Sequence, residues 1–261
     1  IDMLIKLDGS GLSHSSYGMY TYRLWLKDSS SPLRYLTNDN DDYLNSTKVL
    51  NKIKSSVSSI STYRNSVIKR NGVAVVLNLT SYDWNFDLVP AYGASDGQGG
   101  TAFFLIPDGK GNWIATDPRK DQDAITSANK AQNGYLIPLM RLIKYWNTRY
   151  YHCPTLPSYY LETLLINGLR YHYPALSSVK VTVPIAFDAL ATGLLQSCPD
   201  PKGLGPNLDA SLGWDDRSKV SSKAIDMAKY ARWALEYEQK DDHKEAYKWW
   251  GFIFPDFPAY G

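Results

Sequence analysis

Two aspartates lie where a carboxylate could do chemistry. Asp87 interrupts the apolar run Phe86-Asp87-Leu88-Val89-Pro90, and Asp2 precedes the run Met3-Leu4-Ile5. Side chains alternate between the faces of a strand, and a carboxylate buried there is costly unless it is paired or holds a metal. On neighbouring strands the two carboxylates could together bind a hard divalent cation such as Mg²⁺. For either aspartate alone, a solvated sheet face is the ordinary alternative.

Three further residues suit a phosphate or a flat ring. Lys144 lies at the margin of a predicted helix face, roughly 110° from its centre, where it could reach into a cleft. Ser158 follows Pro157 and is predicted to cap the next helix, and a helix N-terminus favours a phosphate. The Tyr159 ring beside it could stack on a base. The common fates of such residues are a solvated lysine, a serine that only caps and a tyrosine that only packs. The apolar face is formed by Leu136, Leu139, Met140, Ile143 and Trp146.

The elements that must position these residues change type along the chain. Strands are expected at 3–7, 67–69, 73–79, 84–92, 101–106 and 112–115, with one helix at about 44–64. Asn71-Gly72 predicts a hairpin, and Pro90 is expected to end its strand. Residues 8–18 and 28–42 are predicted loops, because they are rich in Gly, Ser, Pro, Asn and Asp.

The second half has helical spacing throughout. Helices are expected from 124 to about 150, with a break at Asn133-Gly134, and then at 158–171, 181–197, 215–239 and 241–251. A loop is expected at 198–207. The change near residue 122 predicts an α+β architecture, in which a sheet lobe of residues 1–122 is followed by a helical lobe of residues 123–261. A cleft between the lobes would then hold the site.

Composition restricts the class of protein. The 261 residues are 44% hydrophobic and 21% charged, which is ordinary for a globular chain. A net charge of +2 gives no sign of DNA binding. Because no stretch of about 20 apolar residues occurs, we expect no membrane partner. Cys153 and Cys198 are the two cysteines, which favours a reducing compartment, and we expect a cytoplasmic protein.

Several motifs, taken together, resemble bacterial cGAS/DncV-like nucleotidyltransferases, the oligonucleotide cyclases of anti-phage (CBASS) signalling. Between Asn85 and Trp146 they are Phe-Asp-Leu-Val-Pro-Ala, Ile-Pro-Asp-Gly, Trp-Ile-Ala-Thr-Asp-Pro and Leu-Ile-Pro-Leu-Met-Arg-Leu-Ile-Lys-Tyr-Trp-Asn. The resemblance continues through Ser158-Tyr159-Tyr160-Leu161-Glu162, Asp200-Pro201 and the tail Trp249 to Pro255. It therefore covers nearly the whole chain, with the pieces in the order and spacing of the family.

The resemblance implies a polymerase-β-like nucleotidyltransferase lobe and an oligoadenylate-synthetase-like helical core. It identifies Asp2 with the second aspartate of the family's Asp-x-Asp and Asp87 with the third, both catalytic and metal-binding. We expect the first aspartate and a Gly-Ser motif to precede Ile1, in a longer chain. Gly9-Ser10-Gly11 lies on the wrong side of the strand to be that motif.

The resemblance also implies ligands and partners. Two Mg²⁺ ions, replaceable by Mn²⁺, would be the cofactors, and ATP, GTP or pyrimidine NTPs the substrates. Lys144 and Ser158 would contact the triphosphate, and Tyr159 would stack on the donor base. The product would be a cyclic di- or trinucleotide. Regulatory or conjugation proteins of a defence operon would be partners, the latter acting on a C-terminus that ends here at Gly261.

Two other functions stay open on the sequence. One is an enzyme that makes a linear oligonucleotide, like oligoadenylate synthetases or poly(A) polymerases. The other is a nucleotide-binding or scaffold protein whose active site is dead. A toxin-like enzyme that modifies tRNA or protein fits less well, because such chains commonly lack the long helical lobe.

Overall fold

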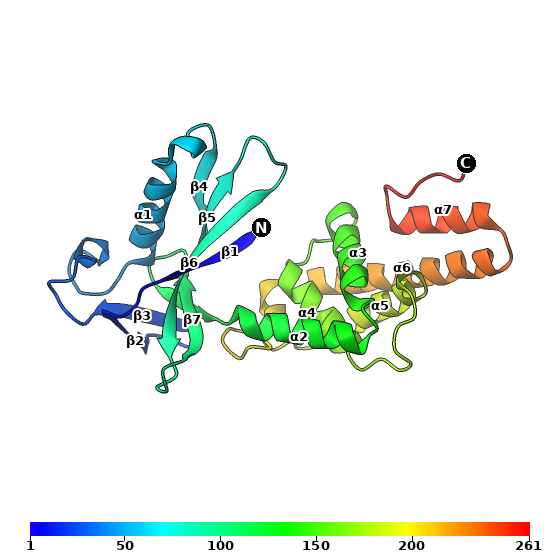
Figure 1. Ribbon diagram of the computed structural model, residues 1–261. Helices are drawn as coiled ribbons and strands as arrows, with labels where there is room; N and C mark the ends of the chain where they lie inside the picture. The colour runs from blue at the N-terminus through cyan, green and yellow to red at the C-terminus, as the bar shows by residue number, and fades with distance from the viewer. The chain divides into compact units, whose positions relative to one another are not determined.

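The N-terminal unit, Ile1–Asp117, is built on an eight-stranded mixed sheet (Figure 1) in a computed structural model that describes residues 1–261. The sheet order is β2-β3-β8-β7-β6-β5-β4, and β1 pairs with β6 in parallel while the other pairs are antiparallel. The strands are β1 (Asp2–Leu7), β2 (Leu12–Ser16), β3 (Thr21–Leu26), β4 (Val67–Asn71), β5 (Ala74–Asn78), β6 (Asn85–Ser95), β7 (Thr101–Pro107) and β8 (Trp113–Thr116).

The predicted hairpin is confirmed. Strands β4 and β5 pair antiparallel with Asn71 opposite Ala74, and Gly72 has a φ of 54°. That left-handed conformation carries no steric penalty at glycine, which explains why an Asn-Gly pair turns the chain here.

Two expectations about strands are wrong. Strand β6 does not end at Pro90, which pairs with Ile5 of β1 and lies between the segments that pair with β5 and β7. Since antiparallel pairing to β5 stops at Leu88 and pairing to β7 starts at Tyr92, the missing N–H of the proline interrupts neither ladder. Within the predicted loop 8–18, β2 is a strand because β3 pairs with it.

One helix covers part of this sheet. Helix α1 (Ser46–Ser58) begins after Asn45, whose side chain accepts from the amides of Thr47 and Lys48. It is shorter than the predicted 44–64, since a turn of 3-10 helix follows at Ser61–Tyr63. Leu50 of α1 packs with Val75 of β5 and Leu88 of β6. Leu88 is next to Asp87, so this small core fixes the strand that positions the aspartate.

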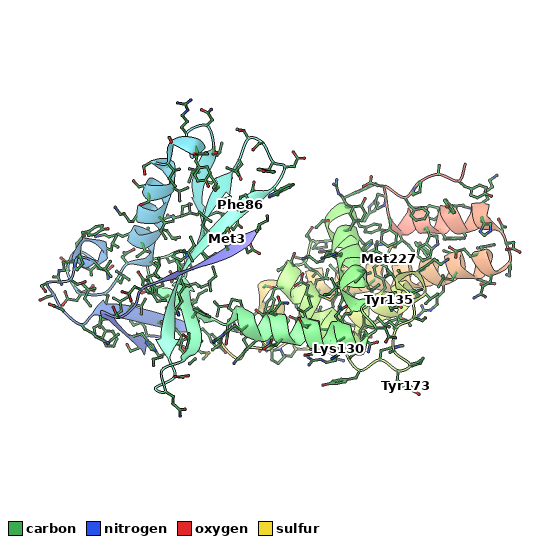
Figure 2. The ribbon with its side chains drawn as sticks, in the orientation of Figure 1. Met3, Phe86, Lys130, Tyr135, Tyr173 and Met227 are labelled. Atoms are coloured by element: carbon green, nitrogen blue, oxygen red, sulfur yellow. The ribbon has the colours of Figure 1, made fainter.

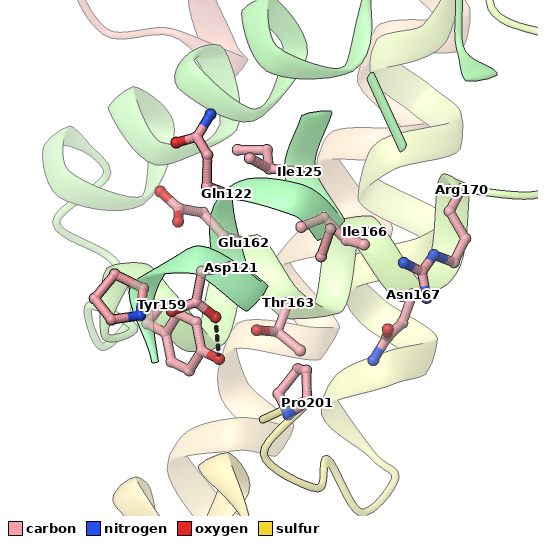
Figure 3. Close-up of a pocket in the computed structure, with 12 residues that line it drawn as sticks. Asp121, Gln122, Ile125, Tyr159, Glu162, Thr163, Ile166, Asn167, Arg170 and Pro201 are labelled. Carbon is pink, nitrogen blue, oxygen red and sulfur yellow. Dashed lines mark hydrogen bonds between the residues drawn. The ribbon is translucent and has the colours of Figure 1, made fainter. Parts of the chain in front are cut away.

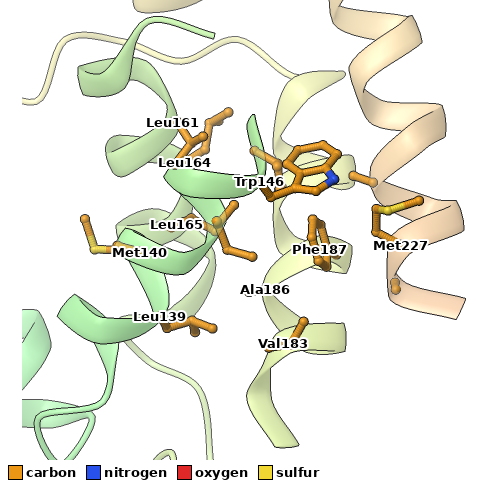
Figure 4. Close-up of a cluster of buried hydrophobic side chains, with 14 of the residues drawn as sticks. Leu139, Met140, Trp146, Leu161, Leu164, Leu165, Val183, Ala186, Phe187 and Met227 are labelled. Carbon is orange, nitrogen blue, oxygen red and sulfur yellow. The ribbon is translucent and has the colours of Figure 1, made fainter. Parts of the chain in front are cut away.

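The C-terminal unit, Pro118–Gly261, is helical. Its helices surround a hydrophobic core (Figure 4), in which the rings of Trp146 and Phe187 meet edge to face with their centroids 4.9 Å apart. Met227 is fully buried in the same core. Asn133 and Gly134, with φ of 54° and 81°, separate the first two helices as predicted. The helices are α2 (Pro118–Ala131), α3 (Leu136–Arg149), α4 (Ser158–Leu169), α5 (Val179–Leu194), α6 (Trp214–Gln239) and α7 (His243–Ile253).

The helical part begins earlier than the sequence predicts. Helix α2 starts at Pro118, whereas the predicted change of architecture falls near residue 122. Proline is favoured in the first turn of a helix because that position needs no N–H partner. No helix in the structure is long and apolar enough to cross a membrane.

Candidate functional site

Asp2 and Asp87 are partners in the parallel pairing of β1 with β6. Figure 2 labels their neighbours Met3 and Phe86 on these two adjoining strands. Residues opposite each other in a parallel pair point to the same face of the sheet, and the strands lie about 4.8 Å apart. The sequence-based prediction that both aspartates lie on adjacent strands is therefore correct.

The surroundings of this pair suit a cation. Asp2 is exposed and Asp87 is half-buried, and no lysine or arginine forms an ion pair with either carboxylate. Two hard oxygen donors without a protein partner fit a divalent ion that takes its remaining ligands from phosphates and water. No group of three His, Cys, Asp or Glu side chains gathers in the structure, so the two aspartates form only part of a ligand set.

Lys144 extends from α3 toward α4. Its Nζ lies 2.6 Å from Oε1 of Glu162, and the two side chains are 36% and 29% exposed. The lysine is therefore neither fully solvated nor free, since its charge is balanced by a carboxylate of the neighbouring helix.

Ser158 stands at the start of α4, but it is not the cap residue. Pro157 occupies the N-cap position, and no side chain makes a capping hydrogen bond there. Ser158 is the first helical residue and is exposed, so its hydroxyl is not used to cap the helix. The expected helix N-terminus is present, while the expected capping role is wrong.

Tyr159 lies in a polar cluster that sequence reasoning did not identify. Its hydroxyl is 2.9 Å from Asp121 Oδ1 of α2 and 3.1 Å from Asp200 Oδ1, so two carboxylates compete for one proton. Lys202 Nζ lies 3.8 Å from the centre of the Tyr159 ring and 3.1 Å from Asp121 Oδ2. One face of the ring is thus occupied by a cation.

The loop at residues 200–205 holds the cluster together. The Asp200 carboxylate accepts from the amides of Lys202, Leu204 and Gly205 at 2.9–3.2 Å. Burial by itself would raise the pKa of Asp200, but these N–H donors and the Lys202 charge hold it below the usual value. Burial and the two neighbouring carboxylates raise the pKa of Tyr159 far above its ordinary range, so the phenol stays protonated.

A pocket of about 250 Å³ opens between α2 and α4 beside Tyr159 (Figure 3). Apolar side chains such as Ile125 and Ile166 form its walls, and Gln122, Glu162 and Arg170 bring polar groups to it. The same Glu162 that pairs with Lys144 therefore borders this pocket.

The predicted residues fall into two groups. Asp2 and Asp87 belong to the sheet unit, and Lys144, Ser158 and Tyr159 belong to the helical unit. Within the helical unit, Lys144 and Ser158 both lie near Glu162, which the sequence places one helical turn after Ser158. Asp121, Glu162 and Lys202 were not predicted, because their roles depend on contacts between segments far apart in the chain.

Comparison with curated proteins identifies two relatives. The chain is 34% identical over 261 residues to a probable cyclic nucleotide synthase of Bacillus cereus (strain VD146), spanning all of this chain and 77% of that protein. It is 27% identical over 203 residues to a cyclic AMP-AMP-AMP synthase of an Acinetobacter strain, spanning 75% of this chain and 56% of that protein. No profile of a known protein family matches the chain.

Solved structures show the same fold. The chain superposes on Vibrio cholerae DncV cyclic AMP-GMP synthase bound to a linear intermediate, with a TM-score of 0.67 and 14% identity over 82% of this chain and 60% of that one. Escherichia coli DncV bound to 3'-deoxy GTP gives a TM-score of 0.66 and 15% identity over 85% of this chain and 60% of that one. The α+β fold of a polymerase-β-like sheet unit followed by a helical unit is thereby confirmed.

Proposed function

Because this chain belongs to the bacterial cGAS/DncV-like nucleotidyltransferases, we propose that it makes a cyclic di- or trinucleotide from NTPs and releases pyrophosphate. The observation that carries this proposal is the common register position of Asp2 and Asp87 on β1 and β6. This register position brings together two carboxylates without a basic partner, at the two residues that the resemblance to the family identifies as metal ligands. The chain spans about 60% of the length of the DncV chains that it matches.

Asp2 and Asp87 would hold Mg²⁺, for which Mn²⁺ can substitute. When bound, two such ions stabilise the attacking hydroxyl oxygen and the departing pyrophosphate. In each step the hydroxyl oxygen bonds to the α-phosphorus, the bond to pyrophosphate breaks, and the hydroxyl proton passes to water. The Asp87 carboxylate lies beside the attacking oxygen in this scheme and orients it. A last such step within the linear product closes the ring, which is the second step for a dinucleotide and the third for a trinucleotide.

The helical unit would bind the donor NTP. A triphosphate brings about four negative charges, and the Lys144 ammonium together with the N-terminus of α4 at Ser158 would balance those far from the metal. The Tyr159 ring, with Lys202 covering one face, offers its other face to the donor base. A base stacked on an aromatic side chain gains about 1–3 kcal/mol.

One experiment separates this proposal from its alternatives. The full-length protein is incubated with each α-³²P-labelled NTP, singly and in pairs, with Mg²⁺ or Mn²⁺, and the products are treated with phosphatase, either alone or after nuclease P1. A cyclic 3'–5' product keeps its label through phosphatase treatment because it has no terminal phosphate. A product that loses its 5'-terminal labelled phosphate to phosphatase alone and keeps its internal label favours a linear-product enzyme, and no product with any NTP pair favours a binding or scaffold protein.

The biological setting belongs to the same proposal. We place the protein in the bacterial cytoplasm, in CBASS anti-phage defence, with regulatory or conjugation proteins as partners. Infection of cells that carry or lack the gene, followed by nucleotide extraction and mass spectrometry, tests the defence role. Equal phage yields in the two strains contradict it.

A further inference from the structure

The lysine proposed for the triphosphate is already engaged. Lys144 Nζ of α3 lies 2.6 Å from Oε1 of Glu162, which is four residues after Ser158 on α4. Residues four apart share one face of a helix. Ser158 and Glu162 therefore lie on one face of α4, and the Glu162 carboxylate lies where a phosphate would compete for the Lys144 ammonium.

Glu162 borders a pocket as well as Lys144. Its side chain borders the 250 Å³ pocket between α2 and α4, and Figure 3 shows it beside Gln122. The pocket is further lined by Arg170, a cation, and Asn167, an amide. A carboxylate that leaves Lys144 can turn into this pocket and keep polar neighbours, so its release does not leave a buried charge without partners.

We propose that Glu162 is a displaceable counter-ion that holds Lys144 in place between turnovers and sets the affinity of the site for polyphosphate. The inference rests on the proposed function, because it takes Lys144 as a triphosphate contact. A ligand with several negative charges would displace Glu162 from Lys144, whereas a ligand with one would not. Glu162 would thereby reduce the affinity of the site for NTPs, which must displace it, more than its affinity for nucleotides that have lost their β- and γ-phosphates.

This role makes a prediction opposite to that for a simple structural ion pair. The Glu162→Gln change removes the competing charge but keeps the length of the side chain and a hydrogen-bonding group. Partly exposed ion pairs are weak, so we expect polyphosphate binding to tighten by about threefold to tenfold. AMP binding should change less than polyphosphate binding, because AMP does not displace Glu162 from Lys144 in the wild-type protein.

Calorimetry on the purified full chain is the test, with three probes: inorganic tripolyphosphate, a non-hydrolysable ATP analogue and AMP. The variants are Glu162→Gln, Glu162→Asp, Lys144→Ala and the double variant. Glu236→Gln is the matched control, since Glu236 pairs with Lys240 at 2.6 Å on the exposed part of α6. Tighter tripolyphosphate binding in Glu162→Gln, near wild-type binding in Glu162→Asp and no gain in the Lys144→Ala background are expected.

The outcomes distinguish the counter-ion role of Glu162 from the phosphate-binding role of Lys144. If Lys144→Ala weakens tripolyphosphate binding but Glu162→Gln leaves it unchanged or weakens it, the counter-ion role is wrong and the proposed donor site stands. If Lys144→Ala leaves tripolyphosphate and ATP-analogue binding unchanged, the phosphate role of Lys144 fails, and the Glu162 inference fails with it. Thermal unfolding of each variant detects a merely structural effect.

Discussion

Asp2 and Asp87 share one register position on the parallel strands β1 and β6, although 85 positions separate them in the chain. Parallel pairing orients both carboxylates to the same face of the sheet. Neither has a basic partner in the structure, so two negative charges remain close together at one strand position. Such an arrangement is stable only with screening by solvent or with a cation bound between the two carboxylates.

The Asp87→Asn variant should retain the fold and lose activity. It removes one metal-binding charge but keeps the size of the side chain, and Asp87 is only half-buried. We expect turnover to fall by at least about 10³-fold and the free energy of unfolding without metal to change by less than about 0.5 kcal/mol. Mn²⁺ binding, followed by electron paramagnetic resonance, should weaken in parallel. Activity near that of the wild type would exclude Asp87 from the site.

The Lys144→Ala variant should weaken NTP binding with little loss of stability. Lys144 is partly exposed, and such ion pairs contribute about 0–1 kcal/mol. We expect KM for the donor to rise by about tenfold and kcat to fall, because one charge that orients the triphosphate is lost. Steady-state kinetics at several salt concentrations provides the measurement. Lys240→Ala, at the exposed residue that follows α6, serves as the control and should leave both constants unchanged.

Two substitutions at Tyr159 separate stacking from hydrogen bonding. Tyr159→Phe keeps the ring but removes the hydroxyl that lies near Asp121 and Asp200, so donor affinity should fall by only about twofold to fivefold. Tyr159→Ala removes the ring, and donor affinity should fall by about fivefold to 150-fold. Fluorescent-nucleotide titration measures both. Equal losses in the two variants would show that the ring does not stack on the base.

Asp200 should stabilise the helical unit in a pH-dependent manner. Its pKa is lower in the folded protein than in the unfolded chain, so its contribution is present above about pH 4 and is lost as the pH falls through the lower folded value. Asp200→Asn should reduce the free energy of unfolding by about 1–3 kcal/mol at pH 7. Urea unfolding monitored at several pH values should show this difference shrinking below pH 4.

The control for this experiment is Asp216→Asn, since Asp216 forms an exposed pair with Lys219 on α6. Its effect should stay below about 0.5 kcal/mol at every pH. A constant difference between wild type and Asp200→Asn across the acid range would contradict the proposed ionisation of Asp200 in the folded state.

Local patterns in the sequence determined most of the elements. The hairpin at Asn71-Gly72, the break at Asn133-Gly134 and the helices of the second half follow from backbone preferences and from apolar spacing, which act over a few residues. The same patterns indicated two aspartates in apolar strands. Motif order then pointed to the family, which the relatives confirm.

Strands β2 and β3 are not among the strands that the sequence predicts, and the cause differs between the two. Strand β2 consists mainly of polar residues, with Leu12 as its one buried side chain, so its extended form depends on pairing with β3. In β3, Leu24 and Leu26 alternate toward the core, which is a strand signal that could have been read. The prediction that β6 ends at Pro90 is wrong because a proline ends a strand only where a neighbouring strand requires its N–H. Where β1, β5 and β7 pair with β6 is set by the tertiary structure.

The sequence alone determined the types of the candidate groups, namely two carboxylates, a lysine, a helix start and a tyrosine. Only the tertiary structure decided their partners. Glu162 beside Lys144, and Asp121, Asp200 and Lys202 around Tyr159, come from helices and loops up to 81 positions apart in the chain. Charge and hydrogen bonding act over a few ångströms of space, so the state of each group depends on side chains that its neighbours in sequence do not reveal.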